Sequence, residues 1–388
     1  MTPLVSQCLE RGVLIPAPEA VCFEDILPER IAPQSVIYPG TVLKGASTFI
    51  GAETRVGMGG GAYIENTQIG ARCSISQGVY RDSTLLDRVS IRNGAELRDN
   101  CLLEEGADLG HTVGLKQTIL FPNVVLGSLI NFCDAILCGG TDRKNHTEVG
   151  SCMALYNYTP QGDKFPSRFG DVPRGLLLNQ PPIFIGGQTQ IISPVYIGFS
   201  SVLAAGSKLT RDIPDGRLVS EHPSHPSDRE LISGFTPNPD RKVASVLDFI
   251  DDLHLLKKWY EKIRVPFFAG TDSEPLMQAA ISRIHAAMEE RKKRLRIFAE
   301  HISQSLEFCI QNHHASQTAS HQRALAMLDI PRERPDFPLE DILQALICQR
   351  SDGKSYLDAV QSLPDSLTKP FLEAYVQKQT HVNFITLF

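Results

Sequence analysis

The sequence has no excess of basic residues: 38 lysines and arginines are outnumbered by 44 aspartates and glutamates, giving a formal net charge of −6. Nucleic-acid-binding proteins usually present a strongly basic face, so no nucleic-acid partner is expected. The chain also lacks a long apolar run. Its first residues, MTPLVSQCLERGVLIP, contain no basic stretch followed by an apolar core. These absences predict a soluble, cytoplasmic protein that spans no membrane.

The nine cysteines form no CxxC pair and follow no regular spacing. An odd, irregular set is untypical of a disulfide framework, and structural zinc sites usually contain paired cysteines or histidines. Cys133, Cys138 and Cys152 lie near one another in the sequence. We interpret them as small apolar side chains in a narrow core, and we expect no metal site.

What the sequence does contain is a six-residue repeat, in which Ile91, Leu97, Leu103, Leu109 and Leu115 are separated by small or acidic residues. A helix would scatter these side chains around its axis, and an ordinary strand would need apolar residues at every second position. The period instead predicts a left-handed parallel β-helix. In this triangular prism, three six-residue sides make one coil and each side points one aliphatic residue inward.

The repeat sets the expected limits of the prism. It is predicted to run from 36 to 212, after a lead-in at 1–35, and it is most regular in IGGQTQ, IISPVY, IGFSSV and LAAGSK from Ile185 onward. A stretch rich in Pro, Gly and charge predicts a loop projecting at 159–182. Long loops on rigid scaffolds are usually functional or disordered.

Downstream of the prism, prolines and glycines predict a linker at 213–243. The rest, 244–388, shows helical periodicity and is predicted to be an α-helical domain. Ser273 ahead of Pro275 indicates the start of a long helix. The basic stretch ERKKRLR at 290–296 lies within this helix. Acidic residues flank it, which favours a solvated helix face over a nucleic-acid patch.

Residues eighteen apart should stack on neighbouring strands, about 4.8 Å apart. Arg98 and Lys116 form such a pair. Both follow an inward leucine, so both are predicted to project from one outer corner. Beyond Phe121 the step is continued by Gly127 and Cys133. Such small residues at inward positions predict a locally thin prism.

Several segments resemble the acetyltransferase half of the bifunctional uridyltransferase/glucosamine-1-phosphate acetyltransferase, a hexapeptide-repeat acyltransferase. They are ELRDNCLLEEGADLGHTVGLKQ, VVLGSLINFCDA, VGSCMALYNY with the following DKF, and IGGQTQIISPVYIGFSSVLAAGS. The resemblance implies acetyl-CoA as acyl donor, a sugar phosphate or nucleotide sugar as acceptor, and a homotrimer. It does not extend to the C-terminal helices.

The chain also resembles bacterial proteins related to UDP-N-acetylglucosamine pyrophosphorylase. However, no Gly-rich nucleotide loop of the GxGTRM kind occurs in the sequence. Such a loop cradles the phosphates with its backbone N–H groups, so nucleotidyl transfer has no visible phosphate site. We therefore expect no uridyltransferase activity.

On the acceptor side, the family holds the sugar phosphate with an Arg and a Lys one coil apart, and these match Arg98 and Lys116. Two fixed cations suit a phosphate, because charge-assisted hydrogen bonds are strong. Lys164 matches a further substrate-contacting lysine, with one residue inserted before it. An alternative interpretation of Arg98 and Lys116 is a surface pair balanced by acidic neighbours such as Glu96 and Asp99.

On the coenzyme side, the resemblance places Asn157 and Tyr158 at the family's Asn-Tyr pair. Ser151, Gly187 and Ala205 fall where the family lines the pantetheine groove. Gly187 and Ala205 are eighteen apart and should stack. Small residues leave room for a thioester arm, although they also suit any tightly wound coil.

Four positions depart from the family pattern. The family's catalytic histidine falls at Ser128, its substrate-contacting tyrosine at Asn131, an asparagine at Glu148 and an arginine at Glu221. Loss of the histidine removes the group that would accept the amine proton, and general-base help typically contributes about 10²- to 10⁴-fold. These changes argue for a different substrate or for lost catalysis.

A replacement base is available in His111. If Leu109 and Gly127 are one coil apart, His111 lies one coil below Ser128 and one residue along, within reach of a hydrogen bond. Imidazole side chains change charge near neutral pH, which suits a general base. The alternatives are that His111 is a plain surface residue, or that His146 takes the role.

Three hypotheses follow. The first is an acyltransferase that moves an acetyl group from acetyl-CoA to an amine or hydroxyl of a sugar phosphate or nucleotide sugar. The second is a non-catalytic sugar-nucleotide-binding or scaffold protein that has lost the base. The third is a metal-dependent enzyme on the same prism, which would need three histidines; His111 and His146 alone do not supply them.

Overall fold

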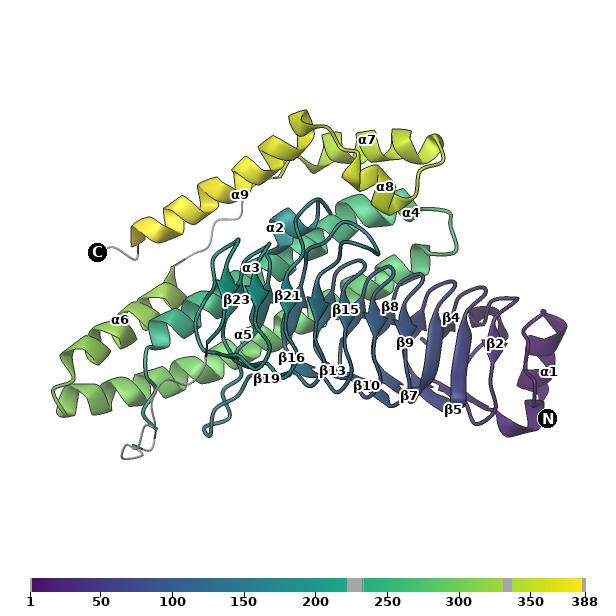
Figure 1. The fold of residues 1–388 in the computed structure, drawn as a ribbon, viewed down its shortest axis with the longest axis horizontal. Helices are drawn as coiled ribbons and strands as arrows, with labels where there is room; N and C mark the ends of the chain where they lie inside the picture. Colours follow the sequence, from purple (N-terminus) through teal and green to yellow (C-terminus); the bar gives the residue numbers. More distant parts are fainter. Residues whose placement is uncertain (1, 222–231, 233, 331–336, 386–388) are drawn as a thin grey trace.

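The computed structural model describes residues 2–221, 232, 234–330 and 337–385. It is a left-handed parallel β-helix of about 11 turns followed by a helical region, as the sequence predicts (Figure 1). Part of the predicted linker, 222–231 and 233, lies outside the described residues.

The coils have three faces, named here face 1, face 2 and face 3. Face 1 contains β2 (Val36–Ile37), β9 (Ser90–Ile91), β12 (Asp108–Leu109), β15 (Val125–Leu126), β18 (Glu148–Val149), β21 (Phe184–Ile185), β24 (Val202–Leu203) and β26 (Leu218–Val219). Face 2 contains β1 (Cys22–Glu24), β3 (Val42–Lys44), β10 (Ala95–Arg98), β13 (Gly114–Lys116), β16 (Asn131–Cys133), β19 (Ala154–Tyr156), β22 (Gln190–Ile192) and β25 (Lys208–Leu209). Strands β5 (Arg55–Glu65) and β7 (Ser74–Arg81) bend around the corner between these two faces.

Face 3 is a separate parallel sheet. It contains β4 (Phe49–Ile50), β6 (Gln68–Ile69), β8 (Thr84–Leu85), β11 (Leu102–Leu103), β14 (Ile119–Leu120), β17 (Ala135–Leu137), β20 (Ser167–Phe169) and β23 (Tyr196–Ile197). The repeating aliphatic residues fill the prism, and Leu97, Leu103 and Leu109 have no exposed surface. Burial of such side chains, each worth about 1.5–3 kcal/mol, is what holds the coils together.

The register departs from a strict six-residue step at several corners, and one of them changes the prediction. Strand β13 is followed by a corner that is one residue short, so Leu115 and Leu120 are inward neighbours only five positions apart. From there Leu126 pairs with Leu109, and Phe132 pairs with Leu115. Gly127 and Cys133 are therefore not the inward residues, and the predicted thin section of the prism is wrong.

The β-helix also extends beyond 36 and 212. At its start, Leu14 bridges to Val36 and β1 pairs with β3, so much of 1–35 already forms coil. Helix α1 (Pro3–Glu10) precedes this coil, and the short helices η1 (Pro18–Ala20) and η2 (Pro28–Arg30) lie within it. At the other end, β26 pairs with β24. The excursion expected at 159–182 is shorter, because it contains β20 and α2 (Val172–Gly175).

The C-terminal region is helical, as predicted. It contains α3 (Pro239–Trp259), the π-helical turn η3 (Tyr260–Arg264), α4 (Val265–Phe268), α5 (Glu274–Gln311), α6 (Ala315–Asp329), α7 (Leu339–Ser351), α8 (Tyr356–Gln361) and α9 (Asp365–Ile385). The predicted start of the long helix at Ser273 is confirmed, because Ser273 precedes the first residue of α5. Among the described residues, no helix is long and apolar enough to cross a membrane.

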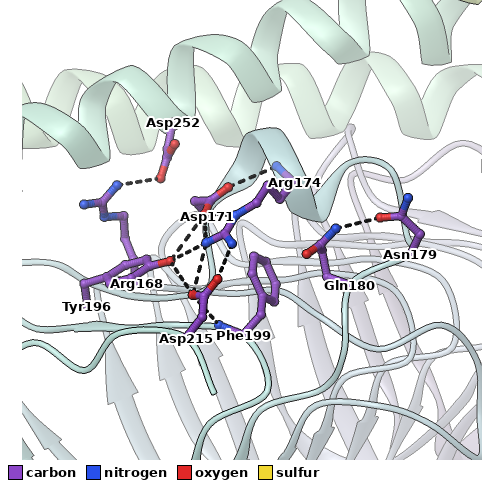
Figure 2. A network of polar contacts seen from close by, with 9 residues as sticks. All are labelled: Arg168, Asp171, Arg174, Asn179, Gln180, Tyr196, Phe199, Asp215 and Asp252. Carbon is purple, nitrogen blue, oxygen red and sulfur yellow. Dashed lines mark hydrogen bonds and ion pairs between the residues drawn. The ribbon is translucent and has the colours of Figure 1, made fainter. Parts of the chain in front are cut away.

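Helices α3 and α5 pack along face 3 (Figure 1), where they contact β6, β8, β11 and β20. Buried ion pairs fix this contact. Arg264 lies between Glu104 and Glu105, and Tyr260 donates a hydrogen bond to Glu104. Farther along, Arg168 of β20 pairs with Asp252 of α3 at 3.1 Å (Figure 2). Faces 1 and 2 keep exposed outward side chains.

Candidate functional site

Arg98 and Lys116 lie directly opposite each other on β10 and β13, so the predicted stacking is confirmed. They project at the corner between faces 2 and 3. Arg98 Nε lies 3.8 Å from Glu96 Oε1, and Lys116 Nζ lies 2.7 Å from Asp99 Oδ2. Exposed ion pairs of this kind contribute only about 0–1 kcal/mol. Both cations therefore remain available to an anionic ligand.

The row of cations continues for one more coil than the sequence suggested. Because Leu97 pairs with Tyr80, Arg81 lies opposite Arg98. Earlier in the same column, charges alternate, with Lys44 between Glu24 and Glu65. Like charges on adjacent strands repel, so a run of three cations departs from the pattern of the column. We call Arg81, Arg98 and Lys116 the cation row.

Lys164 approaches the cation row from the loop after β19, where it forms an antiparallel bridge with Tyr158. Burial and the neighbouring Asp134 carboxylate raise the pKa of the Cys133 thiol, while Arg98, Lys116 and Lys164 act in the opposite direction. Cys133 lies opposite Lys116 on the next strand. Arg98 and Lys116 thus share one corner and Lys164 lies within electrostatic range of it, while the binding of an acceptor by all three stays a prediction.

Asn157 and Tyr158 have different surroundings. The Asn157 side chain is buried and donates a hydrogen bond to Asp134, so it holds the loop to the prism. Tyr158 is 69% exposed and can contact a ligand. The expected coenzyme contact of Asn157 would require its side chain to leave Asp134.

A second column of predicted residues lies at the corner between faces 1 and 2. The backbone N–H of His111 donates to Ser128 Oγ at 3.2 Å, and the backbone N–H of Ser128 donates to Ser151 Oγ at 3.0 Å. Gly187 and Ala205 continue the column, since Ile185 pairs with Leu203 just before them. The five residues form one line along the prism.

Glycines beside this column have no space for a side chain. A Cβ atom at Gly150 would lie 2.4 Å from the Gly187 nitrogen, and one at Gly186 would lie 2.3 Å from the Ala205 nitrogen. The corner is therefore lined by backbone and small side chains. The tight winding of the coils by itself requires small residues here, and contact of Ser151, Gly187 and Ala205 with a pantetheine arm stays a prediction.

The predicted hydrogen bond between the His111 side chain and Ser128 is wrong, because a different atom of His111 bonds to Ser128. The imidazole Nδ1 lies 3.3 Å from Thr112 Oγ1, and only the backbone of His111 bonds to Ser128. The two residues are also directly in register, because Leu109 pairs with Leu126 rather than with Gly127. The imidazole is consequently not held against the hydroxyl that replaces the family histidine.

The remaining predicted residues are divided between two faces. Asn131 is exposed at the start of β16 on face 2, between the two corners. Glu148 lies on face 1, where its carboxylate is 3.7 Å from His146 Nε2. Glu221 pairs with Arg211 at 3.0 Å. Glu148 and the cation row therefore do not meet on the same face of one chain.

Two site features escaped the sequence reasoning. Arg81 lies seventeen residues before Arg98 rather than eighteen, so the regular spacing conceals it. Arg291, in the stretch expected to be solvated, has a 2% exposed side chain paired with Asp134. In the described part of the chain, no three His, Cys, Asp or Glu residues are grouped to hold a metal ion.

The fold and the relatives confirm the expected resemblance to hexapeptide-repeat acyltransferases. The bifunctional protein GlmU of Nostoc sp. is 28% identical over 213 residues, covering 55% of this chain and 42% of the relative. GlmU of Caldicellulosiruptor saccharolyticus is 33% identical over 190 residues, covering 49% and 37%. The chain thus spans less than half the length of these relatives. No protein-family model matches the chain.

Two solved structures are also similar. The polySia-specific acetyltransferase NeuO has 12% identity and a TM-score of 0.16, over 53% of this chain and 77% of that chain. The polysialic acid O-acetyltransferase OatWY has 14% identity and a TM-score of 0.20, over 56% and 93%. Neither score supports a conclusion about activity.

Proposed function

We propose that the protein transfers an acetyl group from acetyl-CoA to an amine or hydroxyl of a sugar phosphate or nucleotide sugar, without uridyltransferase activity. The observation that carries this proposal is the arrangement of face 2. One edge carries Arg98 and Lys116, with Lys164 in the loop that follows β19, and the other carries the backbone-lined column with Ser151. An anionic acceptor and a long coenzyme arm can thus approach the same strip from opposite edges.

The chain's own residues have three tasks in this reaction. The cation row and Lys164 bind and orient the phosphate, and the small-residue column accommodates the coenzyme arm. Acetyl-CoA supplies an acetyl group activated as a thioester. When the acceptor nitrogen or oxygen bonds to the acetyl carbon, the carbon–sulfur bond breaks. The acceptor's proton passes to a base, for which His111 is our candidate, and the thiol is released.

We further propose that the active form is a homotrimer. Outward apolar side chains lie at the same level on the two uncovered faces: Phe184 and Val202 on face 1, and Tyr156 and Ile192 on face 2. A threefold assembly of parallel prisms would lay face 1 of one chain on face 2 of the next.

The second candidate function is non-catalytic binding of a sugar nucleotide. It is favoured by Ser128, whose hydroxyl accepts a hydrogen bond from the backbone of His111, while the His111 imidazole is directed at Thr112 Oγ1 instead. In that case the cation row would still bind the ligand, but no group would accept the proton.

Release of free thiol from acetyl-CoA separates the two candidates. The acceptors are glucosamine 1-phosphate and UDP-glucosamine, and binding of each is measured in parallel by calorimetry. We expect acceptor-dependent thiol release that falls at least tenfold in Arg98→Gln, in line with loss of a charge-assisted contact. Binding without thiol release would overturn acyl transfer and support the non-catalytic candidate.

A further inference from the structure

Helix α5 passes directly behind the acceptor corner, and Arg291 is its central contact there. The guanidinium lies 2.6 Å from Asp134 Oδ1 and donates to Gln117 Oε1 at 3.0 Å. It also donates to the carbonyl oxygen of Lys164 at 3.5 Å. With only 2% of its side chain exposed, Arg291 cannot itself bind a ligand on face 2.

Each partner of Arg291 adjoins a residue of the acceptor corner. Gln117 directly follows Lys116, and the third partner is the backbone of Lys164 itself. Asp134 accepts a hydrogen bond from Asn157, which begins the Lys164 loop. One side chain of the helical region therefore contacts the backbone of Lys164 and the side chain that follows Lys116.

A second contact holds the far end of the same loop. Phe298 packs edge-on against Phe165, with ring centroids 5.0 Å apart. His301 Nδ1 lies 2.8 Å from Asp163 Oδ1, and the Asp163 side chain is buried. Residues 291, 298 and 301 project from one side of α5, as helical spacing requires. The loop from Asn157 to Phe165 is thus fastened at its base and near its end.

The contact of Arg291 with Asp134 and the Lys164 loop requires the planar guanidinium group of an arginine. Burial raises the pKa of Asp134, and the charge of Arg291 opposes this rise. Removing Arg291 would leave a buried carboxylate without its main counter-ion, which is costly. A lysine would keep the charge, but its single nitrogen could not replace the two separate guanidinium nitrogens that contact Asp134 and the Lys164 carbonyl oxygen. The carboxylate and the loop would then have to shift.

We propose that α5 is the positioning element of the acceptor site, and that Arg291 and His301 are positioning residues that set Lys116 and Lys164. This inference rests on the proposed function, and it assigns a role in acceptor binding to the C-terminal helices. The opposite edge of face 2, with Ser151 and Gly187, receives no contact from these two residues. Acceptor and coenzyme binding should therefore respond differently to their substitution.

The test compares the full-length wild type with Arg291→Met, Arg291→Lys and His301→Ala. Arg296→Met is the matched control, since Arg296 is exposed on the same helix. Three quantities are measured: KM for glucosamine 1-phosphate, KM for acetyl-CoA, and hydrogen exchange of residues 157–165. Calorimetric affinity for glucosamine 1-phosphate gives an additional readout that needs no turnover.

We expect Arg291→Met to raise the acceptor KM and dissociation constant about tenfold, because Lys116 and Lys164 would no longer be held to make their charge-assisted contacts with the phosphate. The KM for acetyl-CoA should stay within about twofold, and Arg291→Lys should restore little. Exchange should rise in 157–165 in Arg291→Met and His301→Ala, but not in Arg296→Met. Unchanged acceptor affinity and unchanged exchange in a folded variant would overturn the proposal.

Two outcomes need separate treatment. If Arg291→Met does not fold, His301→Ala decides the question, because its side chain is partly exposed and lies at the edge of the contact. If the wild type releases no thiol, acyl transfer fails, but acceptor affinity and hydrogen exchange still test the role of α5. Failure of the two proposals is therefore distinguishable.

Discussion

The backbone of His111 donates a hydrogen bond to Ser128 Oγ at 3.2 Å, while its imidazole Nδ1 lies 3.3 Å from Thr112 Oγ1. The His111 side chain lies at the corner between faces 1 and 2, and it forms no hydrogen bond to Ser128. If His111 is the base, His111→Ala should lower kcat by about 10²- to 10⁴-fold, the usual contribution of general-base catalysis. The measurement is thiol release at saturating acetyl-CoA.

The control for His111 is His285→Ala, because His285 is exposed on α5. It should leave kcat within about twofold. A His111→Ala protein with wild-type kcat would remove His111 from the mechanism, and a loss of kcat in His146→Ala would then assign the base to His146.

The cation row predicts that Arg81 contributes to acceptor binding. Arg81→Gln should raise the acceptor KM about threefold to tenfold and weaken its dependence on salt concentration, since one charge is lost from an exposed, screened site. Arg92→Gln is the matched control: Arg92 is exposed directly after β9, away from the cation row, and pairs with Asp108. Equal KM values for the Arg81 and Arg92 variants would limit the site to Arg98 and Lys116.

The six-residue repeat predicted the prism because every coil needs inward aliphatic residues, and Leu97, Leu103 and Leu109 supply them. The same rule failed after Leu115. The corner after Leu115 is one residue shorter, and no residue type in the sequence indicates this. Gly127 and Cys133 still occur at the six-residue spacing, so they were predicted to point inward. Leu126 and Phe132 show that burial, not exact period, decides which residues point inward.

The sequence contains a sign that helices cover face 3, although we did not predict this contact from it. Leu102 with Leu103, and Ile119 with Leu120, place apolar residues on both sides of a short strand. Such pairs are typical of a sheet buried on both faces, and α5 contacts β11 here. By contrast, the pairing of Arg291 with Asp134 leaves no pattern in the sequence, because the partners belong to distant elements that only the folded chain brings together.

The buried ion pairs under the helices predict a dependence of stability on pH. Burial raises the pKa of Glu104 to about 7, against the opposing charge of Arg264. The folded state thus binds a proton more tightly than the unfolded chain. This stabilising contribution is complete below pH of about 4.5 and is lost as the pH rises through 7. Part of the wild-type stability should therefore fall between these values.

Glu104→Gln tests this assignment, since it removes the titration while Arg264 keeps Glu105 as a partner. The thermal unfolding midpoint should change less between pH 5 and 7 in the variant than in the wild type. The corresponding difference in unfolding free energy is on the order of a few kcal/mol. Glu96→Gln, on the exposed part of face 2, should retain the wild-type slope. Parallel pH profiles for the wild type and Glu104→Gln would contradict the raised pKa.

The exposed apolar residues predict how copies of the chain associate. Phe184 is 44% exposed on face 1, and Ile192 is 39% exposed at a similar level on face 2. A charge at Phe184 would have to lose its water to enter a contact between these faces. Phe184→Asp should therefore shift the mass measured by sedimentation from trimer to monomer, and acyl transfer should fall if the neighbour completes the site. Ile347→Asp, an exposed position on α7, should preserve both. A wild-type monomer, or a Phe184→Asp trimer, would exclude this interface.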